Sequence, residues 1–138
     1  MLEIQIILTM AIEIKPKTNS ATIDLASLLL FARNQIHIFH LQTMSYAAHI
    51  ALSESYSIVE SSFDSFVETI QGKEGVILKG YKSYNYVDTE PIAYIQSLIG
   101  SINTYRKALS PTYDEIDNML QEAVSGLEKI VYKLKFLK

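Results

Sequence analysis

The feature that most constrains this fold is a pair of long helical stretches with only residues 43–45 between them. The first covers residues 20–42 and is apolar on more than one side, which predicts a helix buried on several faces. The second starts at Ser45, a favourable N-cap, and continues to Gln71, where the glycine that follows at position 72 predicts its end. Because the connection is so short, we expect the two helices to pack antiparallel.

The next segment, residues 72–89, contains three glycines and is interpreted as a connection with at most one short turn of structure. A connection of about 18 residues reaches at most about 60 Å, which is enough to cross a helical bundle lengthwise. The helix that follows is therefore expected to run parallel to the second one. It starts near Pro91, a residue suited to the first helical position, and ends before Pro111.

A fourth helix is predicted from Ser110 to the end of the chain, with acidic residues in its first turns and lysines in its last. This order of charges complements the helix dipole. Together these elements predict an all-α fold, a ferritin-like four-helix bundle at residues 20–138 with a long crossover between its second and third helices. Residues 1–19 are expected to form an extended segment before the bundle, and Met10 is an alternative start.

Composition narrows the classes of function. The chain has 138 residues, of which 49% are hydrophobic, and its few glycines and prolines (five and three) argue against a many-turned all-β fold. It has no cysteine, which excludes disulfides and thiolate metal sites, and its net charge of -3 argues against a protein that coats nucleic acid. The apolar run at residues 4–12 is too short to span a membrane and lacks signal-peptide features, so we expect a cytoplasmic protein without a membrane partner.

The three histidines of the chain lie close together in the sequence, at His37, His40 and His49. His37 and His40 share a face of the first helix, and the short turn brings His40 to the same end of the hairpin as His49. Further along the second helix, Glu60, Asp64 and Glu68 form a row with a spacing of four residues. Such a row is compatible with a solvated face or with a cation site.

These histidines and acids cannot share a metal ion within one chain. His49 and Asp64 are separated by about 22 Å along one helix. A second copy packed antiparallel would bring the histidines of one chain to the carboxylates of the other, and a twofold interface would create two such sites. An ordinary di-iron centre inside one bundle is excluded, because no glutamate is followed by histidine at the third position.

The pattern resembles the Dps family, the ferritin-like DNA-binding proteins from starved cells. His40-Leu41-Gln42 corresponds to the family's His-Trp-Asn, His49 to its second histidine, and residues 64–68, Asp-Ser-Phe-Val-Glu, to its Asp-x-x-x-Glu. The resemblance covers residues 22–72, whereas the rest of the chain matches only in the order of helices. Leu41 replaces the family's tryptophan, and Ser53 occupies a position usually acidic, with Glu54 adjacent.

The resemblance implies a homo-oligomeric shell of twelve subunits, built from dimers, that binds, oxidises and stores iron with peroxide as oxidant. His40 and His49 of one chain, with Asp64 and Glu68 of another, would bind Fe(II) and carry the ferroxidase reaction. His37 and Glu54 are further candidate ligands. Such mixed imidazole and carboxylate ligands also suit Zn or Mn. DNA binding is doubtful, because the family's lysine-rich tail is reduced to two lysines near the N-terminus.

Two alternatives stay open at this point. In the first, the chain is a ferritin-like structural or interaction protein that assembles without ferroxidase activity, as the changes at Leu41 and Ser53 suggest. In the second, the histidines are ordinary hairpin residues and the acids form a solvated face. The tyrosines of the connection, Tyr81, Tyr84 and Tyr86, are interpreted as packing or interface residues.

Overall fold

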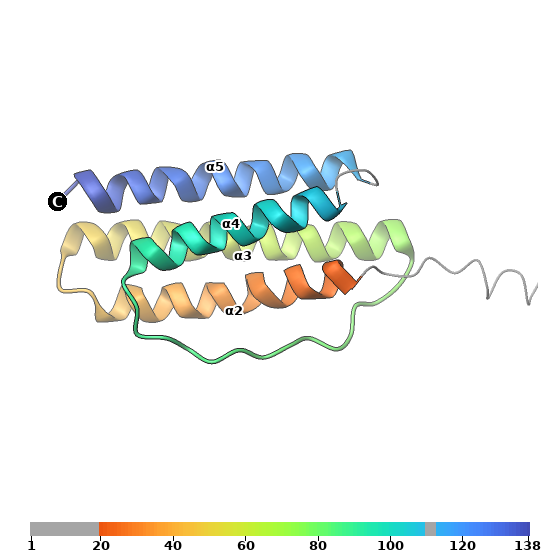
Figure 1. Ribbon diagram of the computed structural model, residues 1–138, viewed down its shortest axis with the longest axis horizontal. Coiled ribbons are helices and arrows are strands. Elements are labelled where there is room, and N and C mark those ends of the chain that lie inside the picture. The colour runs from red at the N-terminus through yellow and green to blue at the C-terminus, as the bar shows by residue number, and fades with distance from the viewer. Residues whose placement is uncertain (1–19, 110–112) are drawn as a thin grey trace, which may run out of the picture.

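The computed structural model describes residues 20–109 and 113–138, which form a bundle of four helices (Figure 1). The helices are α2 (Ser20–Gln42), α3 (Tyr46–Glu74), α4 (Pro91–Leu109) and α5 (Asp114–Phe136). Within these described residues there is no strand, which confirms the predicted all-α class and four-helix bundle. None of the described helices is long and apolar enough to cross a membrane.

The crossover gives every pair of neighbouring helices an antiparallel arrangement. α2 and α5 run in one direction and α3 and α4 in the other (Figure 1). α2 packs on α3 and α4, and α5 packs on the same two helices, so the parallel helices α3 and α4 lie diagonally opposite. The predicted parallel orientation of these two helices is confirmed. Antiparallel neighbours place the positive end of one helix dipole beside the negative end of the next.

One hydrophobic core runs through the centre of the bundle and draws residues from all four helices. Its fully buried members include Leu29 and Ile36 of α2, Phe66 of α3, Ile102 of α4 and Leu127 of α5. The broadly apolar sequence of α2 is explained by its position, because it packs against two helices and is also covered by the crossover.

The end of α3 differs from the expectation. Gly72 lies inside the helix, which continues to Glu74 and ends at Gly75. Gly75 adopts the left-handed conformation (φ 64°), and its N–H donates to the carbonyl oxygen of Gln71 at 2.9 Å. Of the two nearby glycines, only Gly75 takes the left-handed conformation that ends a helix, whereas Gly72 keeps a negative φ.

The crossover, residues 76–90, has no regular secondary structure and is held by side chains of α2. The amide of the fully buried Gln35 donates to the carbonyl oxygen of Val87 at 3.0 Å and accepts from its N–H at 2.8 Å. The hydroxyl of Ser27 accepts from the N–H of Lys82 at 2.9 Å, and the ammonium group of Lys82 pairs with Asp24. These bonds satisfy backbone groups that the segment itself leaves unpaired.

The order of these anchors shows that the crossover runs along α2 in a largely extended form. The step from Ser27 to Gln35, the two residues bonded to its backbone, advances about 12 Å along a helix. The step from Lys82 to Val87 advances about 16 Å along an extended chain. Between the two anchors, Phe31 stacks on the ring of Tyr86 with centroids 4.8 Å apart. The short turn of structure allowed for this segment is not formed.

The start of α4 follows the expectation, with Pro91 as its first residue. The carboxylate of Glu90 accepts from the N–H groups of Ile92 and Ala93, each at 3.0 Å, and so caps the helix. One turn later, Tyr94 packs edge-on against Phe39 of α2, and its burial raises the pKa of its phenol to about 12. The last helix starts later than the predicted Ser110: it begins at Asp114, and Tyr113 before it is extended (φ -144°, ψ 92°). Residues 110–112 and the predicted extended segment 1–19 lie outside the described residues.

Candidate functional site

The turn between α2 and α3 is closed by local hydrogen bonds. The N–H of Thr43 donates to the carbonyl oxygen of Phe39 at 3.1 Å and extends the last turn of α2. Ser45 is the N-cap of α3, and its hydroxyl accepts from the N–H of Ala48 at 3.2 Å, as predicted from the sequence. Because the turn is so short, it fixes the ends of both helices against each other.

At this turn, His40 of α2 and His49 of α3 form a stacked pair. Their ring centroids are 3.6 Å apart and their planes differ by 19°. The Nδ1 of His40 lies 2.6 Å from the carbonyl oxygen of His49, and the Nδ1 of His49 lies 2.9 Å from the carbonyl oxygen of His40. The predicted proximity of these two residues is confirmed.

The reciprocal bonds determine which ring nitrogens are free. A carbonyl oxygen can only accept, so the Nδ1 of both His40 and His49 must carry the hydrogen. In the neutral form each ring then keeps a lone pair on Nε2. This arrangement is the one that protein metal sites commonly use, in which the second ring nitrogen donates to a carbonyl group and orients the ligand.

His37 has a different environment, although it lies one helical turn from His40. Its Nδ1 lies 3.0 Å from a guanidinium nitrogen of Arg33, which can only donate, so this Nδ1 accepts. The ring of His37 also stacks on Tyr56 of α3 with centroids 4.4 Å apart. In its neutral form the remaining nitrogen of His37 carries the hydrogen, and a cation lies beside the ring. These features make His37 a poor metal ligand.

Tyr56 and Arg33 are part of this cluster, and the sequence analysis did not include them. The ring of Tyr56 contacts His37, meets His40 edge-on at 5.5 Å, and lies 5.1 Å from the guanidinium carbon of Arg33. Arg33 also reaches Glu60 of α3 at 3.7 Å. The spacing of four residues between Arg33 and His37 is a signal that could have identified this contact.

The acidic candidates lie elsewhere on α3. Asp64 and Glu68 are exposed, and within residues 20–109 and 113–138 neither has a hydrogen-bond or ion-pair partner. Glu54 instead faces α5, where its carboxylate lies 2.6 Å from the ammonium nitrogen of Lys133. In the described part of a single chain, no three metal-binding side chains come together. The histidine pair and the acids Asp64 and Glu68 are therefore separate in one subunit.

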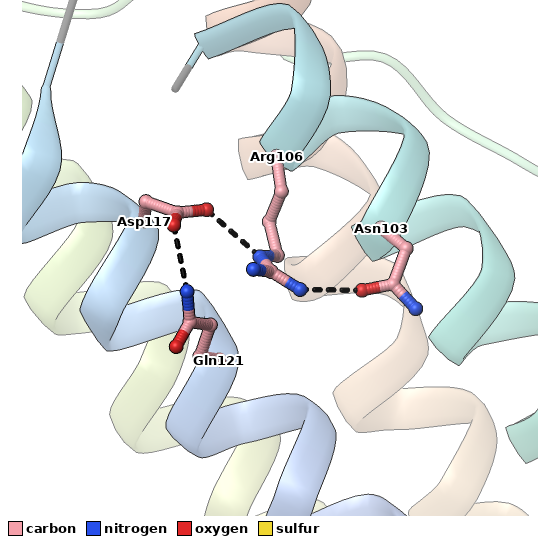
Figure 2. Close-up of polar contacts among 4 residues, drawn as sticks. All are labelled: Asn103, Arg106, Asp117 and Gln121. Carbon is pink, nitrogen blue, oxygen red and sulfur yellow. Dashed lines mark hydrogen bonds and ion pairs between the residues drawn. The ribbon is translucent and has the colours of Figure 1, made fainter. Parts of the chain in front are cut away.

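A second polar cluster joins α4 to α5 at the opposite end of the bundle (Figure 2). The guanidinium of Arg106 donates to Asp117 at 2.9 Å and to Asn103 at 2.8 Å, and the amide of Gln121 donates to the other carboxylate oxygen of Asp117 at 2.7 Å. The hydrogen bond from Arg106 lowers the pKa of Asp117. Both carboxylate oxygens are engaged by neighbours, so we interpret this cluster as a link between helices.

Comparison with known proteins places the chain in a family. Residues 40–134, which begin at His40 and contain His49 and all four acidic candidates on α3, match the model of a family of unknown function, DUF5856. No curated protein and no solved structure shows significant similarity to the chain. Since the match covers more than half of the chain, the protein belongs to the DUF5856 family.

Proposed function

We propose that this protein binds Fe(II) at a site shared by two subunits and oxidises it, as the resemblance to the Dps family implies. The observation that carries this proposal is the stacked pair of His40 and His49. Both rings are fixed by hydrogen bonds to the protein backbone, and both keep an Nε2 lone pair in the neutral form. Such fixed imidazoles bind a divalent metal ion without having to be ordered first.

The other half of the proposed site is supplied by Asp64 and Glu68 of a second subunit. Their carboxylates are exposed and have no partner among the described residues of their own chain. In an antiparallel dimer formed through the outer faces of α2 and α3, the histidine pair of each subunit meets the carboxylates of the other. The resemblance extends this dimer to a shell of twelve subunits.

The ligand set accounts for the proposed chemistry. Neutral imidazole and carboxylate ligands suit Fe(II), and Zn or Mn would compete for the same site. Two Fe(II) ions each give one electron to hydrogen peroxide, which takes up two protons and becomes two molecules of water. The carboxylates favour the higher charge of the Fe(III) product. His37 and Glu54 are left out of the set, because Arg33 and Lys133 already engage them.

A second function is assembly without oxidation. It is favoured by Leu41 and Ser53, which stand where the Dps pattern has a tryptophan and an acid. In that case the protein assembles and has no peroxide-dependent iron oxidation above that of buffer. Measurement of Fe(II) oxidation with peroxide, alongside the native mass of the same sample, separates the two functions.

The shared site is tested by complementation between two variants. His49→Ala removes one half of the site and Asp64→Asn weakens the other, so neither variant alone should bind Co(II), a spectroscopic substitute for Fe(II), with the affinity of the unmodified protein. In a mixed dimer, the intact histidine pair of one chain meets the intact acids of the other. Unfolding and refolding the two variants together should therefore restore one of the two sites.

The matched control is Glu60→Gln, which changes an exposed acid of the same row and should leave Co(II) binding within about twofold. Native mass spectrometry of the mixture verifies that mixed dimers form. If mixed dimers form and the mixture still fails to bind Co(II), the histidines and acids do not share a site. If His49→Ala alone binds Co(II) normally, the histidine pair is not the metal ligand.

A further inference from the structure

The end of the bundle that contains the α2–α3 turn exposes an unusual number of large apolar side chains. Met44 at the turn is 100% exposed, Tyr46 at the start of α3 is 80% exposed, and Phe136 at the end of α5 is 70% exposed. We call the full set the apolar tip; its members are Leu41, Met44, Tyr46, Ile50, Tyr132, Phe136 and Leu137. The turn and the end of α5 lie at the same end of the bundle (Figure 1).

One groove joins the α3 members of the apolar tip to Leu137 at the end of the chain. Tyr46 and Ile50 of α3 and Leu137 after α5 line one shallow groove of about 380 Å³. On the neighbouring row of α5, the rings of Tyr132 and Phe136 lie 5.8 Å apart. A contiguous exposed apolar surface of this kind marks a place where a protein meets a partner or a membrane.

Lysines lie along the α5 side of the apolar tip. The last ten residues of the chain contain four lysines and no acid, and Lys135 and Lys138 are exposed beside the aromatic rings. Among nearby acids, Glu54 is paired with Lys133 and Glu90 accepts from the first N–H groups of α4, while Glu128 and Asp88 are exposed. The surface therefore combines protruding apolar side chains with lysines that are available to an anionic partner.

We infer that the apolar tip docks on the surface of an anionic lipid bilayer. Met44 and Tyr46 protrude from the turn, which suits insertion among lipid chains better than it suits a rigid partner. The lysines would lie at the level of the phosphate groups. A symmetric contact between two copies is disfavoured, because it brings the lysine-rich ends together. The contact is superficial, since none of the described helices could span the bilayer.

Vesicle sedimentation tests this proposal. The unmodified protein should sediment with vesicles of phosphatidylcholine and phosphatidylserine in equal parts, and weakly or not at all with phosphatidylcholine alone. Replacing Met44 and Leu41 by serine should lower the partition coefficient by about tenfold or more. Replacing Lys135 and Lys138 by glutamine should lower it by about 25-fold, since each lysine near an anionic surface contributes about fivefold.

Matched controls change the same residue types elsewhere on the molecule. Ile77→Ser alters a 69% exposed residue of the crossover, and Lys107→Gln an exposed lysine of α4; both should leave the partition coefficient unchanged. The altered residues are exposed, so circular dichroism should show unchanged folding. Absence of sedimentation with phosphatidylserine overturns the proposal, as does a native mass that falls in the Leu41/Met44 variant, which would assign the apolar tip to a subunit interface.

Discussion

The two connections on either side of α3 are held in place in different ways. The α2–α3 turn, residues 43–45, is closed by its own hydrogen bonds and by the two helix ends that it joins. The crossover, residues 76–90, makes no regular structure, and its polar contacts are to Gln35, Ser27 and Asp24 of α2 and to Gln71 of α3, whose side-chain oxygen accepts from the N–H of Leu78. The difference lies in where the holding groups come from: the turn is closed by its own Thr43 and Ser45, whereas the backbone of the crossover is held by side chains of the helices beside it.

The same difference separates the polar residues of α2 into two groups. Gln35 uses the nitrogen and the oxygen of its amide on one backbone position, Val87, and is fully buried, so a ligand in solvent cannot reach it. His40 uses one ring nitrogen on the backbone of His49 and keeps the other. A buried, fully hydrogen-bonded residue such as Gln35 stabilises the fold, whereas a residue such as His40, with one nitrogen not bonded to the backbone, is a candidate for binding.

The largest change in the free energy of unfolding is expected at Gln35, whose side chain binds the backbone of the crossover. Gln35→Leu leaves the N–H and carbonyl of Val87 facing an apolar side chain, which should lower the free energy of unfolding by about 3 kcal/mol. Urea denaturation measures this loss. The neighbouring Asn34→Ala, at an exposed position, should change the same quantity by less than about 0.5 kcal/mol. Equal effects of the two substitutions would mean that the crossover does not depend on Gln35.

A smaller effect is expected where α3 passes into the crossover. Gly75 has a positive φ of 64°, so Gly75→Ala should destabilise the protein by about 1 kcal/mol. Gly72 is inside the helix, and a Cβ added to it would have no atom within 4 Å. Gly72→Ala should therefore stabilise the protein by about 0.8 kcal/mol. Thermal unfolding of the two variants gives the signs directly. If Gly75→Ala destabilises the protein and Gly72→Ala stabilises it, the helix ends at Gly75. If Gly72→Ala destabilises the protein instead, the helix ends at Gly72, as predicted from the sequence.

Local patterns were enough to predict the turn but not the crossover. The bounds of α2, the cap at Ser45 and the start of α4 at Pro91 depend on residues close together in the chain, and all three are confirmed. The path of the crossover depends on contacts between residues more than fifty positions apart, such as Gln35 with Val87, which no local pattern encodes. Its length nevertheless gave the parallel orientation of α3 and α4.

For the candidate site, the sequence predicted which residues lie at the same end of the hairpin but not how their side chains are oriented. The short turn predicted that His40 and His49 lie at the same end of an antiparallel hairpin. The structure shows in addition that their rings are stacked. The reciprocal bonds to backbone carbonyls, which decide the free nitrogen of each ring, depend on side-chain rotation and were not predictable. Arg33 and Tyr56 belong to no metal-ligand pattern, and the only local signal for their place beside the histidines is the four-residue spacing of Arg33 and His37. The pairing of the histidines with Asp64 and Glu68 stays a prediction.

The smallest effect concerns the charged anchor of the crossover and appears only at alkaline pH. The hydrogen bond to Asp24 raises the pKa of Lys82 above its ordinary value of 10.5. A raised pKa means that this pair contributes its full stability below pH 10.5 and loses it as the pH rises through the folded-state pKa. The lysine is solvent-exposed, so the loss should be slight.

The effect of Tyr94 on stability must be separated from that of Lys82, because both side chains lose a proton at alkaline pH. Its pKa of about 12 lies above its ordinary value of 10.0, so it also makes stability fall as the pH rises above 10. The comparison is therefore made in a Tyr94→Phe background, with and without Lys82→Met, by urea denaturation at pH 8 to 12. If Lys82 anchors the crossover, the difference between the two proteins shrinks toward the alkaline end, because the unmodified lysine has then lost its charge. A difference that is constant with pH would assign the contribution of Lys82 to its aliphatic stem, and the crossover would then be held to α2 by the neutral contacts of Ser27, Phe31 and Gln35.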